Sequence, residues 1–220
     1  MKVGMDGVLL GAWTDTSAAE RILDIGTGTG LIALMMAQRN DSALIDAIEI
    51  DLEAFEEAKM NFQESAWSNR IRIECCSFQD FAEQTDRKYD LIVSNPPFFA
   101  KDGLKAPAQN RAQARHSDSL PLKFLISGAA NILTETGRIA LIMPVESLPE
   151  ILQLCLSNKL YISRLCRIKP NPIKPDFRIL FELTQTDCIA IEERLMIEFE
   201  THHDYTPEYK ELTRDFYLKF

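Results

Sequence analysis

The sequence has no hydrophobic run that approaches the roughly 20 apolar residues needed to cross a membrane. Its first residues, MKVGMDGVLLGAW, contain too short an apolar stretch for a signal peptide and no small-residue cleavage site. The five cysteines form no C-x-x-C pair, and their odd number does not suit a disulfide framework. We therefore expect a cytoplasmic protein with reduced thiols, no membrane association and no zinc site.

The chain also lacks internal repeats, low-complexity tracts and any composition shift that would mark a second domain. Its 220 residues suffice for one substantial core, and an apolar share of 46% is ordinary for a globular protein. We therefore treat residues 1–220 as a single domain. The sequence gives no indication of the oligomeric state.

Positive charge is scarce overall, because the formal net charge is −9. A uniformly acidic surface would exclude a polyanionic partner. The cations are concentrated, however, in residues 98–123, with five Lys or Arg against two Asp, and in residues 159–180, with six against one. These two segments are either solvated loops or a localised footprint for phosphate groups.

Strand-like and helix-like segments alternate through the first two-thirds of the chain. The expected strands are 21–25, 43–49, 71–75, 89–94 and 138–143, and the expected helices are 30–39, 51–62, 120–133 and 147–157. This alternation predicts an α/β fold with a doubly wound, mostly parallel Rossmann-like sheet and helices on both faces.

The last third of the chain changes character. Residues 161–168, 178–185 and 188–200 look like strands joined by short turns, which predicts an antiparallel C-terminal edge. Three prolines between Lys169 and Pro175 exclude a helix or a central strand, so this segment is expected to be an exposed loop.

A glycine-rich loop joins the first expected strand to the first expected helix. Gly26, Gly28 and Gly30 follow the strand with G-x-G-x-G spacing, which favours S-adenosylmethionine over a dinucleotide. Asp24 at the strand end suits the cofactor's amino-acid end but would repel a pyrophosphate. Glu49, which ends the next strand, suits a bidentate bond to two ribose hydroxyls. The alternative for the loop is a tight structural turn.

The contact to the cofactor's adenine is expected after the third strand. Methyltransferases that bind S-adenosylmethionine through such a glycine loop often carry an acidic residue at that position. Here the distance from the strand selects Ser77, followed by Phe78, and Asp80 lies a few residues on. Ser77 and Phe78 are therefore the candidate adenine contacts.

The expected strand 89–94 stops at an Asn-Pro-Pro-Phe motif. Asn95 and the carbonyl of Pro96 can accept both hydrogens of an aromatic amine and favour a nitrogen with an available lone pair. Pro96 and Pro97 fix φ and so hold the carbonyl in place, while Phe98 can stack on the base. Catalysis would then rest on positioning and oriented dipoles. The alternative is a turn that merely ends the strand.

Six segments of this sequence resemble the bacterial tRNA1(Val) (adenine-N(6))-methyltransferase family of class I methyltransferases. They are KVGMDGVLLGAW, LDIGTGTGLIALMMAQR, IEID, DLIVSNPPFF, ARHSDSLPL and LTRDFYL. The resemblance implies S-adenosylmethionine as cofactor and tRNA as partner, with methylation of an adenine beside the anticodon of a valine tRNA. It begins almost at the first residue, so the family's preceding N-terminal segment is expected to be absent.

The resemblance assigns the roles residue by residue. Its cofactor-binding residues are Asp24, Gly26, Gly28, Gly30 and Glu49, and its adenine-holding residues are Asn95, Pro96, Pro97 and Phe98. The following segment supplies the candidate substrate contacts Phe99, Arg111, Arg115 and His116. His202 and His203 have no Cys or carboxylate at ligand spacing, so we expect no metal there.

Two other functions remain open. The same type of Asn-Pro-Pro-Phe motif occurs in methyltransferases that act on a protein glutamine or on a DNA adenine. A catalytically idle RNA-binding relative would keep the fold and the basic segments.

Overall fold

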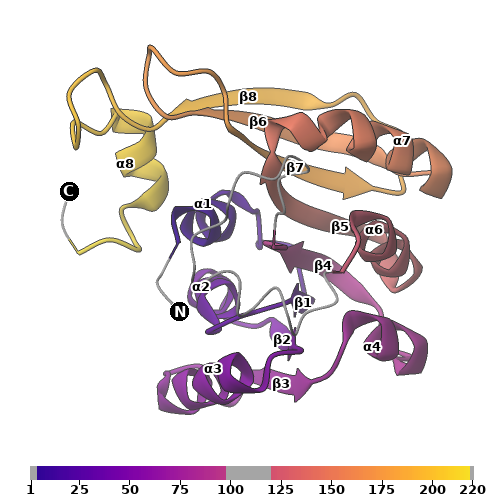
Figure 1. Ribbon diagram of the computed structural model, residues 1–220. Coiled ribbons are helices and arrows are strands. Elements are labelled where there is room, and N and C mark those ends of the chain that lie inside the picture. The colour runs from indigo at the N-terminus through magenta and orange to yellow at the C-terminus, as the bar shows by residue number, and fades with distance from the viewer. Residues whose placement is uncertain (1–3, 98–119, 219–220) are drawn as a thin grey trace.

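The computed structural model describes residues 4–97 and 120–218 (Figure 1). These residues form an eight-stranded sheet with the order β3-β2-β1-β4-β5-β7-β6-β8. Its strands are β1 (Arg21–Ile25), β2 (Leu44–Glu49), β3 (Ile71–Cys75), β4 (Tyr89–Ser94), β5 (Leu133–Pro144), β6 (Tyr161–Lys169), β7 (Arg178–Thr184) and β8 (Ile191–Met196).

Helices cover both faces of the sheet, which confirms the doubly wound fold. The helices are α1 (Met5–Trp13), α2 (Leu31–Arg39), α3 (Leu52–Glu64), α4 (Phe78–Gln84), α6 (Leu122–Asn131), α7 (Leu148–Asn158) and α8 (Pro207–Thr213), with a 3-10 turn at Val145–Ser147. One core cluster joins the sheet to α1, α2, α3 and α8, and a second joins it to α4, α6 and α7. None of the described helices is long and apolar enough to span a bilayer.

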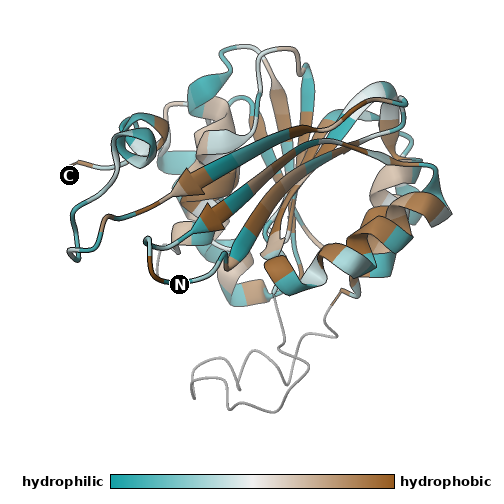
Figure 2. Ribbon diagram, turned by 90° about the horizontal axis from the view of Figure 1, so that it is seen from above, coloured by the Kyte–Doolittle hydropathy of each residue, from teal (hydrophilic) through white to brown (hydrophobic). Residues whose placement is uncertain are grey.

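The central strands are buried on both faces. Every residue of β4 except Asp90 is buried, and successive side chains enter opposite clusters: Leu91 and Val93 the first, Ile92 the second. A continuous apolar run, rather than an alternating one, is what a parallel strand between two helical layers requires. Figure 2 shows hydrophobic residues along the sheet and on the helices that pack against it.

The direction of the last strand differs from the expectation. β7 is antiparallel to both β5 and β6, as expected, but the edge strand β8 runs parallel to β6. The chain does not reverse in a hairpin after β7; residues 185–190 carry it past the start of β6 to the outer edge. The predicted strand 188–200 is also shorter, at Ile191–Met196.

Helices α1 and α4 were not predicted, and the boundary between α6 and β5 was wrong. The start of α8 is predictable, because Thr206 caps the helix and Pro207 stands in its first turn. Seven of the nine residues of α1 are buried, so its sequence shows no polar face and no helical period. α4 has only seven residues, too few for a periodic signal. The helix predicted to reach Leu133 ends at Asn131, and β5 begins at Leu133 instead of Arg138.

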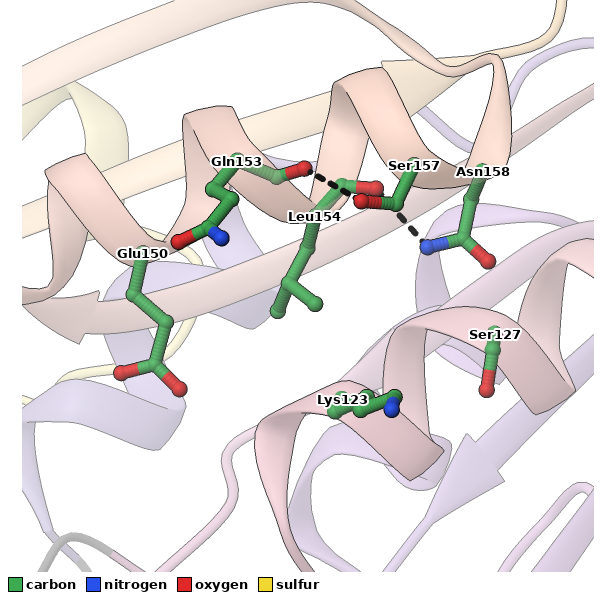
Figure 3. Close-up of a pocket in the computed structure, with 7 residues that line it drawn as sticks. All are labelled: Lys123, Ser127, Glu150, Gln153, Leu154, Ser157 and Asn158. Carbon is green, nitrogen blue, oxygen red and sulfur yellow. Dashed lines mark hydrogen bonds between the residues drawn. The ribbon is translucent and has the colours of Figure 1, made fainter.

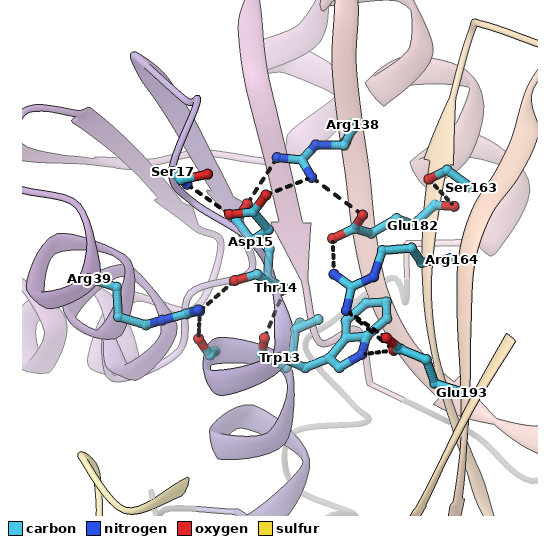
Figure 4. Close-up of polar contacts among 12 residues, drawn as sticks. Trp13, Thr14, Asp15, Ser17, Arg39, Arg138, Ser163, Arg164, Glu182 and Glu193 are labelled. Atoms are coloured by element: carbon cyan, nitrogen blue, oxygen red, sulfur yellow. Dashed lines mark hydrogen bonds and ion pairs between the residues drawn. The ribbon is translucent and has the colours of Figure 1, made fainter. Parts of the chain in front are cut away.

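A chain of ion pairs crosses β5, β7, β6 and β8, the strands formed by the C-terminal half of the protein (Figure 4). Glu182 on β7 is 1% exposed and lies between Arg138 on β5 and Arg164 on β6, at 3.5 and 3.3 Å. Arg164 also pairs with Glu193 on β8 and lies over the Trp13 ring of α1, 4.2 Å from its centroid. The network therefore attaches α1 to four adjacent strands.

Removal of the Glu182 carboxylate should destabilise the fold strongly. Burial raises the pKa of Glu182, and the two arginines oppose that shift. Glu182→Ala leaves both guanidinium groups without their shared partner, and we expect a loss of about 3 kcal/mol or more in the free energy of unfolding, measured with urea. Glu192→Ala, at an exposed position of β8, is the control and should change it by less than about 0.5 kcal/mol. Equal effects would contradict this account.

Candidate functional site

The predicted site residues among residues 4–97 lie in a row at the carboxyl ends of the parallel strands. Four parallel strands end here in the order β3, β2, β1, β4. Ile25 pairs with Ser94 at the ends of β1 and β4. Gly26 and Asn95, which follow these two residues, therefore lie side by side. Glu49 ends the neighbouring strand β2. The order of strands reverses between β1 and β4, which is where ligands bind in open α/β sheets.

The loop between β1 and α2 requires its glycines. Gly26, Gly28 and Gly30 have φ of 67°, 60° and 88°, a region that residues with a Cβ rarely adopt. A Cβ on Gly30 would also lie 2.4 Å from the Phe62 ring, whereas one on Gly26 would meet nothing within 4 Å. The loop is therefore packed on the α3 side and open at Gly26.

Asp24 is a buried carboxylate with one oxygen left over. Its Oδ2 accepts hydrogen bonds from Thr27 Oγ1 at 2.6 Å and from the backbone N–H of Ala33 in the first turn of α2 at 3.1 Å. Its Oδ1 is the one buried side-chain oxygen or nitrogen without a partner in the described part of the chain. An unpaired buried acceptor costs about 1–3 kcal/mol, so Oδ1 is positioned for a donor that the protein itself does not supply.

Burial also raises the pKa of Asp24, from 3.8 to about 7. The hydrogen bonds from Thr27 and Ala33 oppose this shift, and the nearby Glu49 charge adds to it. Near neutral pH the carboxyl group therefore exists in both protonation states, and a cationic ligand group at Oδ1 would favour the ionised form.

Glu49 already holds three backbone N–H groups. Oε2 accepts from Gly28 at 2.8 Å, and Oε1 accepts from Ile50 and Asp51 at 2.9 Å each. A carboxylate offers about four acceptor positions, so one remains, on Oε2, and a bond to two hydroxyls requires one of the three N–H groups to leave. Glu49 thus links the conformation of the glycine loop to ligand binding.

The residues after β3 divide their roles. Ser77 caps α4: its Oγ accepts from Asp80 N at 3.1 Å and bonds Asp80 Oδ2 at 2.7 Å. Phe78 is 5% exposed, and its side chain lies in the core beside Gly128. A contact from Phe78 to a ligand can therefore come only from its backbone, while Ser77 and Asp80 keep polar atoms at the surface. Both assignments stay predictions.

The Asn-Pro-Pro-Phe motif that starts at Asn95, from here on called the acceptor motif, begins where β4 ends. Ser94 Oγ donates to the carbonyl of Ile25 at 2.7 Å, which ties the end of β4 to the end of β1. Asn95 is partly exposed, Pro96 is buried and Pro97 is exposed. Among residues 4–97 and 120–218, no group forms a hydrogen bond with the Asn95 side chain. The predicted contacts Phe98, Phe99, Arg111, Arg115 and His116 lie outside the described residues.

Sequence reasoning missed the residues that support the loop. Thr27 bonds Asp24, and Asn61 Nδ2 donates to the carbonyl of Thr29 at 2.9 Å. Thr27 could have been recognised as a hydroxyl three residues from a carboxylate, but Asn61 lies on α3 and gives no local signal. Arg178, which belongs to the cation-rich segment 159–180, bonds Asp6 of α1 at 2.9 Å.

The histidine pair of the C-terminal region does have a carboxylate nearby. Ligand atoms of Glu198, His202 and His203 lie within 4.8 Å of one another. The turn at His203, where φ is 68°, brings Glu198 to 3.2 Å from His202. The expectation that no carboxylate stands at ligand spacing was therefore wrong, because Glu198 lies only four residues before His202.

A separate pocket lies between α6 and α7 (Figure 3). Its volume is about 440 Å³, and its lining is mostly polar: Lys123, Ser127, Glu150, Gln153, Leu154, Ser157 and Asn158. Ser157 and Asn158 bond carbonyls of their own helix, at Gln153 and Leu154. None of the predicted cofactor or acceptor residues lines this pocket.

Comparison with known proteins identifies the family. Residues 7–150 match the family model of the methyltransferase small domain. Two curated relatives, from Christiangramia forsetii and Trichodesmium erythraeum, are 44% and 45% identical over 100% of this chain and 92% of their own length. Both are named tRNA1(Val) (adenine(37)-N6)-methyltransferase. This chain belongs to that family.

Solved structures agree with the fold of the methyltransferase. A predicted O-methyltransferase from Agrobacterium tumefaciens aligns with a TM-score of 0.73 over 96% of both chains at 23% identity. TrmN from Thermus thermophilus aligns with a TM-score of 0.59 at 20% identity, over 82% of this chain and 48% of its own. At these identities the likeness concerns the fold alone.

S-adenosylmethionine is the methyl donor of such an enzyme, and the residues present fit it. The unpaired Asp24 Oδ1 suits the cofactor's ammonium group, and the open space beside Gly26 leaves room at the strand end. Glu49 Oε2 accepts a single N–H and can receive a hydroxyl, and a second hydroxyl can replace one of the three N–H groups.

Cofactor binding should become tighter as pH rises through about 7. The folded-state pKa of Asp24 is raised, so the ionised form that attracts an ammonium group grows between pH 6 and 8. Calorimetric titration with S-adenosylmethionine should show this trend and proton release below pH 7. Asp24→Asn should bind more weakly, with a flat profile, while Asp41→Asn, at an exposed position, should behave as the parent. A flat profile in the parent would refute the assignment.

Proposed function

We propose that this protein transfers a methyl group from S-adenosylmethionine to the exocyclic amine of an adenine in tRNA, at position 37 beside the anticodon of a valine tRNA. The observation that carries the proposal is the pairing of β1 with β4, which puts Asn95 directly beside Gly26. The names of the full-length relatives supply the substrate class. Because tRNA is the substrate, we also propose a cytoplasmic location.

The acceptor residues act by orientation. The Asn95 Oδ1 and the Pro96 carbonyl would accept the two amine hydrogens, which turns the nitrogen lone pair away from the ring and toward the donor. Pro96 and Pro97 fix the backbone before substrate arrives, so little order is lost on binding. Ser94, bonded to Ile25, keeps this geometry in register with the cofactor loop.

The cofactor residues act by charge and shape. Bound S-adenosylmethionine supplies an electrophilic methyl group on a sulfonium. Asp24 would hold the ammonium end, Glu49 the ribose, and the backbone after Ser77 the adenine. The protein supplies no nucleophile to this transfer, so its contribution is alignment and oriented dipoles.

Loss of the Asn95 amide should remove catalysis but not folding or cofactor binding. Asn95→Ala should lower kcat on unmodified tRNA at least about 100-fold, because it removes one of the two hydrogen-bond acceptors that orient the adenine amine in the transition state. The assay is transfer of labelled methyl to tRNA transcripts, with the label located by nucleoside analysis as 6-methyladenosine. Asn131→Ala, at an exposed position of α6, is the matched control.

An Asn95→Ala variant as active as the parent would overturn the acceptor mechanism. Label that enters a protein glutamine or a DNA adenine, but no tRNA, would overturn the substrate assignment and leave the fold and cofactor assignments intact. Binding of tRNA without any transfer by the parent would favour the idle RNA-binding relative.

A further inference from the structure

Four cations gather at the outer end of the sheet. Arg167 and Lys169 belong to β6, Arg194 belongs to β8, and Lys174 lies in the loop between β6 and β7. β6 and β8 form the edge of the sheet beyond β7 (Figure 1). We call these four residues the cationic edge.

The side chains of the strand residues point to one face. Cys166, Ile168 and Leu195 enter the core cluster that includes α1 and α2. Successive residues of a strand alternate between faces, so Arg167, Lys169 and Arg194 point to the opposite face, where α6 and α7 lie.

Two of these cations oppose each other at an energetic cost. Arg167 and Arg194 are direct partners in the parallel pairing of β6 with β8. Like charges at directly opposed positions destabilise a sheet. Within residues 4–97 and 120–218, no carboxylate forms an ion pair with either arginine, with Lys169 or with Lys174.

On the other face of the same strands, carboxylates neutralise an arginine. Arg164, three residues before Arg167, pairs with Glu182 and Glu193 and stacks on Trp13 (Figure 4). A chain with 33 acidic residues could neutralise the cationic edge in the same way. Glu192 and Glu193 belong to β8, Glu198 follows it, and Asp176 lies in the loop before β7. Among the described residues none of these carboxylates forms an ion pair with the four cations; Glu193 pairs with Arg164 and Glu198 with His202.

The register places the cationic edge level with the acceptor motif. Ser94 pairs with Leu141, and the pairing continues through Phe181 and Leu165 to Glu192. Two residues further along each strand, the same ladder leads from the level of Pro96 to Arg167 and Arg194. With strands about 4.8 Å apart, the two arginines are about 14 and 19 Å from the end of β4.

We propose that the cationic edge binds the phosphate backbone of the substrate tRNA while the target adenine lies at Asn95. This inference rests on the proposed tRNA methylation and assigns it a second contact surface. Arginine and lysine side chains that pair with no carboxylate in the described part of the chain, level with the acceptor site on an otherwise acidic protein, provide the charge complementarity that phosphate recognition needs. The contact fixes orientation and not base sequence.

The test compares two variants with the same loss of charge. Arg167→Gln/Arg194→Gln removes the opposed pair, and Lys59→Gln/Arg72→Gln removes two exposed cations from α3 and the opposite edge strand β3. We expect the first variant to weaken binding of unmodified tRNA about tenfold and to lower the salt slope of log Kd by about two. We expect the second to match the parent.

Three further readouts separate this role from damage to the fold. Affinity for S-adenosylmethionine should not change, KM for tRNA should rise without loss of kcat, and the urea midpoint should equal or exceed that of the parent. Arg167→Lys/Arg194→Lys should retain most of the affinity, because a phosphate accepts either cation. A lowered midpoint would show that the arginines stabilise the sheet, and it would overturn the inference.

The two proposals fail in different ways. A parent that methylates tRNA, with an Arg167→Gln/Arg194→Gln variant that binds tRNA like the parent, overturns only the cationic edge. A parent that neither binds nor methylates tRNA overturns the proposed function and, with it, this inference.

Discussion

The parallel pairing of β1 with β4 is the contact on which the site depends. Ile25 and Ser94 are partners in this pairing, and the Ser94 hydroxyl adds a bond to the Ile25 carbonyl. The glycine loop and the acceptor motif therefore leave the sheet as neighbours, although 69 residues separate them. A shift of one residue in this register would turn each side chain to the other face and separate the two halves of the site.

Two arrangements of charged groups in this protein are unfavourable, and a third is neutralised by ion pairs. Asp24 is buried with an unpaired oxygen, and Arg167 opposes Arg194 across two strands. At the opposite end of the sheet, Glu182 lies between two arginines, and the network extends to α1. Residues that lack a partner are expected where a ligand will supply one, whereas the fully paired network serves the stability of the fold.

Local patterns predicted the strands, the glycine loop and the acceptor motif because each depends on neighbours in the sequence. The same reasoning failed for α1, whose nearly complete burial hides the helical period, and for β8, whose direction depends on how the chain passes β6. It could not foresee that Arg178 pairs with Asp6, because 172 residues separate the two. Phe78 was chosen by position, but its side chain belongs to the core.

The sequence by itself determined the chemistry: a G-x-G-x-G loop after a strand, a carboxylate at each of two strand ends, and an Asn-Pro-Pro motif. These features are short, so residue type and spacing specify them. Only the tertiary structure decided which carboxylate oxygen stays unpaired, that Glu49 holds Gly28 in place, and that Arg167 and Arg194 pair on one face level with Pro96. Those facts arise from pairing between distant strands, and no local pattern encodes the register of such pairs.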